Sequence, residues 1–341
     1  MPPLNILIIG GGIAGPTLAH WLTQLKLSPV PKITILERHP SPRTSGQAVD
    51  IRKGAVHIMQ RMGLEPAIRA KSTTEEGISF VYADGKTKAS FPRTGDAQAQ
   101  GFTSEFEILR GDLAGLLYDS TKGLPGVEWV FDEHVVSLQQ SETQTGRVSV
   151  RFANRLADAE FDLVVGADGM VSRTRRLVWG KGPGAEEYLR SLGQYMAFFT
   201  IPRTGEDTAM AQWYNASRGR LAMLRPDQYG ETRAYLAVTD RDAGRFEGIK
   251  RAVGEGVEAQ MGWLEGEFAG AGWETRRILD GMRQAPDFYM QQTAQVVMDE
   301  FVKGRVALLG DAGYCPSVIT GMVGLSCFFR ASSLSLSLRA C

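Results

Sequence analysis

Cysteine and histidine are scarce in this 341-residue chain, which has three cysteines and four histidines. The cysteines are Cys315, Cys327 and Cys341, and their spacing is typical of neither a metal site nor a disulfide framework. The histidines form no cluster, so the sequence predicts no zinc site and no Ser-His-Asp arrangement. We expect four structural histidines, no bound metal and a reducing, cytoplasmic environment.

The chain also lacks an excess of charge and a long apolar run. Lysine and arginine number 38, as do aspartate and glutamate, so the formal net charge is zero. A neutral chain has no bulk attraction to nucleic acid or to an anionic membrane. No run of about 18 apolar residues occurs, and we expect no transmembrane helix. The sequence leaves the oligomeric state open.

Glycine, in contrast, is abundant, and its most informative cluster lies near the start. Residues 5–9 are apolar and β-branched, which predicts a buried strand, and residues 13–25 have the apolar spacing of a helix. Between them, Gly10, Gly12 and Gly15 have GxGxxG spacing. The first glycine permits a tight turn, the second lets the backbone approach a pyrophosphate, and the third lets the helix pack on the strand.

An acidic residue follows this turn at the distance expected for a dinucleotide site. Glu37 ends a second predicted strand at 32–36, where its carboxylate can accept hydrogen bonds from a ribose diol. A carboxylate would repel a 2′-phosphate, so FAD or NAD fits this site better than NADP. The alternative is a glycine-rich turn in some other parallel α/β domain.

Two parts of the chain differ in pattern. The first alternates strands and helices, with a hairpin at 73–91 that turns at Asp84-Gly85 and a helix at 109–118. Residues 190–240 instead have strands without intervening helices, which predicts an antiparallel sheet. Its expected strands are 195–201, 210–214, 220–224 and 233–238, and a helical region follows at about 252–284.

Three predicted strands of this chain end in glycine and acidic residues. They end at Gly10, at 166–169 around Asp168, and at Gly310-Asp311. In an open α/β sheet, ligands bind outside the carboxyl ends of the strands. We therefore expect these ends to converge on one extended ligand.

Three ordered motifs carry a resemblance to a known family. They are the glycine turn with Glu37, DLVVGADGMVSRTRR at 162–176 and GRVALLGDAGYCPSVITGM at 304–322. Over about residues 4–322 the chain resembles the FAD-dependent aromatic hydroxylases, or group A flavoprotein monooxygenases. This family includes para-hydroxybenzoate hydroxylase and the tetracycline-inactivating monooxygenases.

The resemblance implies an α/β fold, α+β overall, in which a Rossmann-like FAD-binding domain has an inserted antiparallel-sheet substrate domain. The implied segments are FAD-binding parts at 1–72, 101–180 and 286–325, a hairpin at 73–100 contributing to the substrate domain, the substrate domain at 181–285, and an atypical tail at 326–341.

The resemblance also assigns residues to the cofactors. Gly10, Gly12, Gly15 and Glu37 would hold the ADP half of FAD, and the Gly310-Asp311 motif would hold the ribityl chain. The motif of Asp168 is implicated in FAD and NAD(P)H binding in the family. The alternative for Asp168 is a turn residue that binds local N–H groups, and Arg175 and Arg176 are equally compatible with a solvated helix face.

Weaker matches add three residues. Asp50 would contact the flavin, Arg43 the nicotinamide cofactor and Arg110 the FAD. Without the family, we would interpret Arg110 as a helix-start arginine paired with Glu107 or Asp112.

The implied activity is that of a monooxygenase in which NAD(P)H, with NADPH favoured, reduces the FAD. Reduced FAD reacts with O₂, and a flavin C4a-hydroperoxide transfers one oxygen atom to an aromatic or polycyclic small molecule, for example in secondary metabolism. No catalytic side-chain constellation is visible, because the cofactor carries the chemistry. Aromatic and methionine residues of the second sheet are candidates for the substrate pocket, with about half facing inward: Tyr195, Met196, Phe198, Phe199, Trp213, Tyr214 and Met223.

The chain departs from the family pattern at Val323, where the family has glycine. The following Ser-Leu rhythm resembles no family segment and is typical of a truncated or wrongly spliced gene. In the family, a helix there directs its N-terminus at the flavin, where negative charge develops. We therefore expect weak FAD binding or poor folding. An FAD-dependent reductase or dehydrogenase of the same fold and an inactive flavin-binding fragment are the alternative functions.

Overall fold

The computed structural model describes residues 2–95, 101, 103–141, 146–180, 188–240 and 243–317. Within these residues no helix is long and apolar enough to cross a membrane. The departure from the family pattern at Val323 lies outside the described residues.

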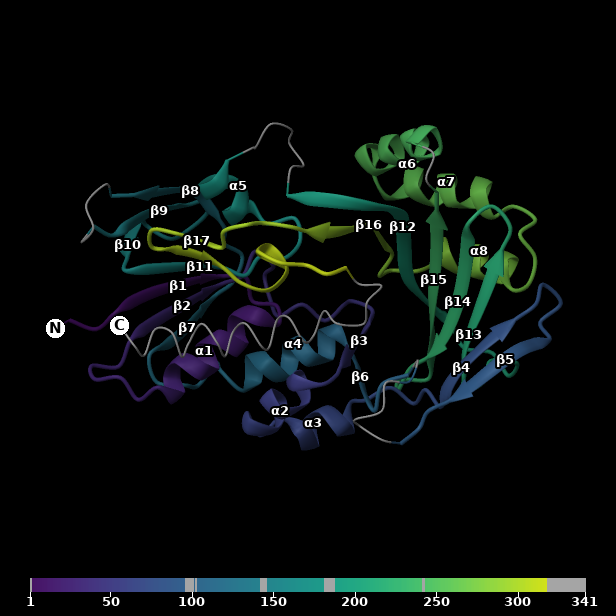
Figure 1. Ribbon diagram of the computed structural model, residues 1–341, viewed down its shortest axis with the longest axis horizontal. Helices are drawn as coiled ribbons and strands as arrows, with labels where there is room; N and C mark the ends of the chain where they lie inside the picture. Colours follow the sequence, from purple (N-terminus) through teal and green to yellow (C-terminus); the bar gives the residue numbers. More distant parts are fainter. Residues whose placement is uncertain are drawn as a thin grey trace.

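A six-stranded sheet organises the half of the molecule that contains the N-terminus (Figure 1). Five strands are parallel, and β17 pairs antiparallel with β18 at one edge. The order is β17 (Val302–Lys303), β18 (Val306–Leu308), β11 (Leu163–Gly166), β1 (Asn5–Ile9), β2 (Lys32–Leu36) and β7 (Val127–Val130). The strands predicted before the three glycine-acid motifs are therefore the adjacent strands β1, β11 and β18, and their carboxyl ends meet at one edge.

Two layers cover this sheet because alternate residues of β1 point to opposite faces. Ile6 and Ile8 pack in the cluster that contains residues of α1 (Ala14–Gln24), α2 (Gly54–Arg61), α3 (Glu65–Ala70) and α4 (Arg110–Asp119). Leu7 and Ile9 pack instead against a three-stranded sheet of β8 (Val135–Gln140), β9 (Val148–Phe152) and β10 (Ala159–Phe161).

A seven-stranded sheet forms the other half (Figure 1). Its order is β16 (Tyr289–Val296), β12 (Leu189–Pro202), β15 (Glu231–Thr239), β14 (Arg220–Pro226), β13 (Ala211–Ala216), β4 (Gly77–Val81) and β5 (Thr87–Pro92). All neighbours are antiparallel except the parallel pair β13–β4. The predicted hairpin at 73–91 is confirmed as β4–β5, which joins the edge of the sheet predicted at 190–240.

The two faces of this sheet have different neighbours. One face packs against helices α6 (Ala243–Glu255), α7 (Val257–Phe268) and α8 (Thr275–Met282). The opposite face has its own apolar cluster, without helical residues, and approaches a two-stranded ribbon of β3 (Ala48–Ile51) and β6 (Phe106–Leu109). We call this face the open face because none of the described residues in its cluster is helical, although Phe198 and Met223 on it are buried. The ribbon connects it to the helices of the parallel sheet, because α4 begins directly after β6.

Candidate active site

The glycine turn after β1 has the close contacts that its spacing predicts. Gly10 has φ +121°, and a Cβ added there would lie 2.3 Å from the Ala167 carbonyl oxygen. A Cβ on Gly15 would lie 2.1 Å from the Gly10 carbonyl oxygen, so α1 packs on the turn only with glycine at this position. Gly12 differs, because a Cβ there would meet only Arg110 Nη2, at 3.9 Å. The open side of Gly12 matches the approach of a phosphate group.

Glu37 lies beside this turn at the end of β2. Its Oε2 accepts from the Gly11 N–H at 3.0 Å, and its Oε1 accepts from the His39 N–H at 3.0 Å. A carboxylate oxygen accepts more than one hydrogen bond. The half-buried carboxylate of Glu37 therefore keeps acceptor capacity for a ribose diol.

Two guanidinium groups, of Arg43 and Arg110, lie near the turn. The stem of Arg110 lies over Gly46, where an added Cβ would be 3.1 Å from Arg110 Cβ. Burial and then the charge of Arg110 lower the pKa of Arg43. Neither guanidinium donates a hydrogen bond to a residue that the structure describes, and Glu107 and Asp112 bond to other groups. Among the described residues, Arg110 therefore does not form the alternative ion pair with Glu107 or Asp112.

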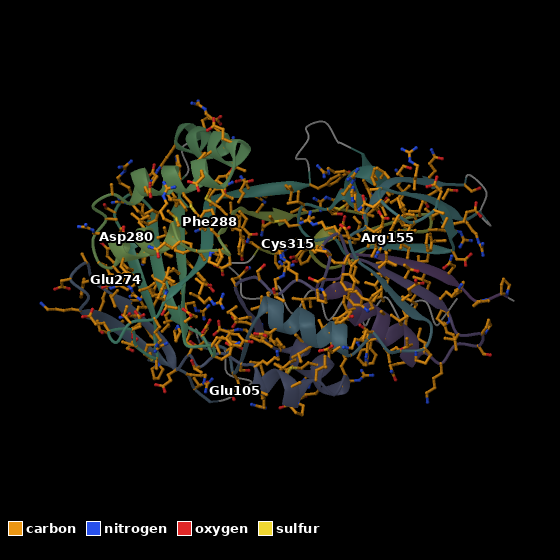
Figure 2. All side chains as sticks on the ribbon, turned by 180° about the vertical axis from the view of Figure 1, so that it is seen from behind. Glu105, Arg155, Glu274, Asp280, Phe288 and Cys315 are labelled. Atoms are coloured by element: carbon orange, nitrogen blue, oxygen red, sulfur yellow. The ribbon has the colours of Figure 1, made fainter. Side chains whose placement is uncertain are left out.

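Asp311 has an unused acceptor beside these cations. Its Oδ1 is buried and has no hydrogen-bond partner among the described residues. Burial raises the pKa of Asp311 to about 6, against the opposing effects of the Arg110 charge and a hydrogen bond with Cys315. Cys315, labelled in Figure 2, lies near the middle of the molecule between the two sheets. A buried acceptor without a donor favours a ligand hydroxyl at this position.

Asp168 makes local hydrogen bonds at the start of α5 (Arg173–Trp179). It accepts from Ser172 Oγ at 2.5 Å, from the Thr174 N–H at 2.9 Å and from Thr174 Oγ1 at 3.0 Å. These contacts are those expected of a turn residue that binds nearby groups, which is the alternative to a cofactor contact. Asp168 therefore shapes the loop after β11. A direct contact between Asp168 and a cofactor stays a prediction.

Arg175 lies in α5, and the sequence alone left its environment open. Its side chain is buried, in contrast to exposed Arg176. It donates from Nη1 to the Ala312 carbonyl and from Nη2 to the Met170 carbonyl, both at 2.7 Å. Arg175 thus ties the loop after β11 to the segment that carries Asp311.

Asp50 belongs to a buried charged cluster between the β3–β6 ribbon and β14. It pairs with Arg52 at 3.2 Å, while Arg225 contacts both Glu75 and Glu107. Three carboxylates thus face two guanidinium groups. Burial raises the pKa of Asp50 to about 6 and that of Glu75 to about 7. Sequence reasoning did not find Glu75 or Arg225, which are 150 residues apart.

The strand alternation of the seven-stranded sheet sorts the candidate substrate-pocket residues into two groups. Met196, Phe198, Trp213 and Met223 lie on the open face. Tyr195, Phe199 and Tyr214 lie on the helix-covered face. Two tyrosines not in the predicted set, Tyr235 and Tyr289, also belong to the open face.

These two tyrosines connect the sheet to the β3 segment. The Ala48 N–H donates to Tyr235 Oη at 3.4 Å, and the Gln47 N–H donates to Tyr289 Oη at 3.3 Å. Tyr289 Oη also makes a short hydrogen bond with Gln47 Oε1. Polar groups thus lie at the rim of an aromatic surface that adjoins the elements of the cofactor site.

These features fit FAD along the carboxyl edge of the parallel sheet. The glycine cradle matches a pyrophosphate, the unpaired cations of Arg43 and Arg110 match an anionic group, and the orphaned oxygen of Asp311 matches a sugar-alcohol hydroxyl. When bound, FAD supplies the redox and oxygen-transfer chemistry, which side chains of this chain do not provide. The architecture, a parallel sheet with a glycine cradle beside a second, mostly antiparallel sheet, defines a class of flavoproteins.

Comparisons with known proteins identify the family. A family model described as an FAD binding domain matches residues 4–264. The FAD-dependent monooxygenase asL4 of Sarocladium schorii is 35% identical over 339 residues, 98% of this chain and 75% of that protein. The flavin-dependent monooxygenase eupH of a Phoma species is 36% identical over 332 residues, 95% of this chain and 74% of that protein. The chain therefore belongs to the FAD-dependent monooxygenase family and is an enzyme of this kind.

A solved structure supports the same conclusion. The tetracycline destructase Tet(51) superposes with a TM-score of 0.80 at 30% identity, covering 99% of this chain and 82% of that one. The predicted aromatic-hydroxylase resemblance, FAD as cofactor and the monooxygenase class are confirmed.

Proposed function

We propose that this monooxygenase hydroxylates a planar aromatic or polycyclic small molecule that carries oxygen substituents, with NADPH as reductant. The observation that carries the proposal is the apolar cluster on the face of the seven-stranded sheet that no helix of the described residues covers, which contains Phe198, Trp213 and Met223. Aromatic and thioether side chains favour flat apolar ligands.

Polar groups at the rim of this face support the proposal that the substrate carries oxygen substituents. Tyr235 and Tyr289 place hydroxyl groups beside an apolar surface. Small-molecule pockets usually combine an apolar lining with a few polar groups of this kind. Phe198 fixes both rings, with centroid distances of 4.9 Å to Tyr235 and 5.1 Å to Tyr289. Because Tyr289 donates its hydroxyl proton to Gln47 Oε1, Tyr289 would orient a substrate phenol by accepting from it, whereas Tyr235 would orient a phenol or a ketone.

The cofactor roles are part of this proposal. We assign Gly10, Gly12, Gly15 and Glu37 to the ADP half of FAD, and Gly310-Asp311 to its ribityl chain. Arg110 would bind the phosphates, Arg43 the nicotinamide cofactor and Asp50 the flavin. We further propose that the segments at 73–100 and 181–285 act as the substrate domain in a cytoplasmic enzyme.

The test is NADPH oxidation by the FAD-loaded protein across a panel of phenols, anthraquinones and other fused-ring ketones. The proposal predicts oxidation that depends on both O₂ and the aromatic compound, with a product heavier by one oxygen atom in mass spectrometry. Turnover that continues under argon would identify a reductase or dehydrogenase. FAD that is bound but never bleached by NADPH would identify an inactive fragment.

A matched pair of variants tests the sidedness of the sheet. Phe198→Ala removes an open-face ring, and Phe199→Ala removes a ring on the helix-covered face. The proposal predicts that Phe198→Ala raises the KM for the aromatic substrate about tenfold, while Phe199→Ala acts on stability. Equal effects of both variants on KM would contradict the proposed pocket.

A further inference from the structure

The hairpin formed by β14 and β15 reaches from the seven-stranded sheet to the segment that carries Arg110. This segment runs from β6 into the first turn of α4, and Arg110 is the first residue of the helix. The backbone N–H of Arg110 donates to the Gln47 carbonyl at 3.0 Å. The guanidinium itself has no hydrogen-bond acceptor among the described residues, so its placement depends on the backbone beneath it.

On one side of Arg110, strand β14 holds β6. Arg225 makes a short ion pair with Glu107, three residues before Arg110. The guanidinium also donates from Nε to Glu75 Oε2 at 2.8 Å. Glu75 and Glu107 are 2% and 3% exposed, so this contact is shielded from solvent. Burial of a bonded ion pair makes it costly to break.

On the other side of Arg110, the tip of the hairpin holds α4. Tyr229 Oη donates to Asp112 Oδ1 at 2.7 Å, and Gln228 Nε2 donates to Asp112 Oδ2 at 2.8 Å. Both oxygens of Asp112 are thereby bound by adjacent residues of one turn, and Lys71, outside the hairpin, also contacts Oδ1 at 3.2 Å. Asp227 orders this turn, because its Oδ1 accepts from the N–H groups of Tyr229 and Glu231, each at 2.9 Å.

The hairpin therefore contacts the chain three residues before and two residues after Arg110. We propose that the β14–β15 hairpin is a clamp that positions Arg110 for the phosphates of FAD, with Gln228 and Tyr229 acting as positioning residues through Asp112. The clamp couples the sheet that would hold the substrate to the cofactor site. This inference rests on the proposed contact between Arg110 and FAD.

The test is a double-mutant cycle on FAD affinity, measured by fluorescence titration of the apo-protein. The clamp variant combines Gln228→Ala with Tyr229→Phe, which removes the two hairpin donors to Asp112 and leaves the Lys71–Asp112 ion pair and the buried Arg225 cluster intact. It is compared in the Arg110 background and in the Arg110→Gln background. Tyr82→Phe is the matched control, because Tyr82 is 51% exposed and lies at the far edge of the same sheet.

We expect the clamp variant to raise the Kd for FAD about fivefold when Arg110 is present, a coupling of about 1 kcal/mol. In the Arg110→Gln background the same variant should have no further effect, and Tyr82→Phe should have none in either background. Melting temperatures of all variants report whether the fold is kept.

The outcomes separate the two proposals. An equal loss of affinity in both backgrounds, or no loss in either, would overturn the clamp. If Arg110→Gln itself leaves FAD affinity unchanged, the contact between Arg110 and FAD is wrong, and the clamp fails with it. Loss of affinity confined to the Arg110 background supports both.

Discussion

Arg175 joins two loops at the carboxyl edge of the parallel sheet by donating from Nη1 to the carbonyl oxygen of Ala312, 137 residues further along the chain. Its second donor, Nη2, binds the Met170 carbonyl in the loop after β11. Ala312 directly follows Asp311, so this buried side chain fixes the carboxylate that we assign to the ribityl chain. The loops after β11 and β18 therefore act as one unit.

Replacement of Arg175 should weaken FAD binding at the flavin end. Arg175→Gln leaves a buried carbonyl unsatisfied, which costs about 1–3 kcal/mol, so we expect a loss of about tenfold or more in FAD affinity. ADP affinity should be unchanged, because Arg175 does not contact the glycine turn. Titration of the apo-protein with FAD and with ADP measures both. Arg176→Gln, at the exposed neighbouring position, is the control, and an equal loss for ADP would contradict the assignment.

Alanine should strongly destabilise the fold at Gly15 but hardly change its stability at Gly12. Gly15→Ala would place a Cβ 2.1 Å from a backbone oxygen, and we expect a loss of several kcal/mol in the free energy of unfolding. A Cβ on Gly12 would meet only Arg110 Nη2, at 3.9 Å, so Gly12→Ala should change stability by less than about 0.5 kcal/mol while FAD affinity falls about tenfold or more. Thermal melts of the apo-proteins and FAD titrations separate the two. Strong destabilisation by Gly12→Ala would show that this position is structural.

FAD affinity should depend on pH through Asp311, whose pKa is raised to about 6. Hydroxyl donors favour the ionised carboxylate, so binding should weaken as pH falls through 6, by about tenfold per pH unit below the pKa. Asp311→Asn should bind more weakly at pH 7.5 and show a flatter profile between pH 7.5 and 5.

A control is needed because the pKa of Glu75 is also raised, to about 7. Glu75→Gln should retain the dependence of FAD affinity on pH. Loss of the slope in this variant, or its persistence in Asp311→Asn, would assign the effect to the charged cluster instead.

Glu133 should stabilise the β8–β9 region by binding backbone N–H groups. Its buried Oε1 accepts from His134, Ala153 and Asn154, and its Oε2 accepts from Arg155 and Leu156, at 2.7–3.0 Å. Burial alone would raise the pKa of this carboxyl, but the backbone donors outweigh burial and lower the pKa to about 2.

A lowered native pKa gives stability that is fully present above the unfolded-state pKa of about 4.3 and is lost as pH falls toward 2. Glu133→Gln should therefore lower the free energy of unfolding by about 3 kcal/mol at pH 7, and the difference should shrink between pH 5 and 2. Urea unfolding across this range measures it, with exposed Glu128→Gln as control. A difference that is constant with pH would exclude the carboxylate as the cause.

The local elements of the cofactor half followed from the sequence, because their signals are short-range. The strand, glycine turn and helix at 5–25 depend on apolar periodicity and on contacts between residues a few positions apart. Gly15, for example, packs against the Gly10 carbonyl five residues earlier. The hairpin at 73–91 was predictable for the same reason, since its turn contains Asp84-Gly85 and Gly85 has φ +81°.

The sequence predicts which residues share a face of the second sheet, but it does not predict which face the helices cover. Alternation along a strand divides Phe198 from Phe199, but it does not say which set faces the cofactor. That choice depends on where α6, α7 and α8 pack, and these helices begin tens of residues after β12, the strand that carries Phe198 and Phe199.

The sequence by itself determined the glycine turn, the acid at Glu37 and the strand-end motifs, because each is a local pattern with a local physical cause. Only the tertiary structure decided that Arg175 reaches Ala312, that Arg225 lies between Glu75 and Glu107, and that Tyr229 reaches Asp112. These contacts join residues more than 100 positions apart. Their geometry is set by strand order and by the docking of one sheet beside the other, which no short pattern encodes.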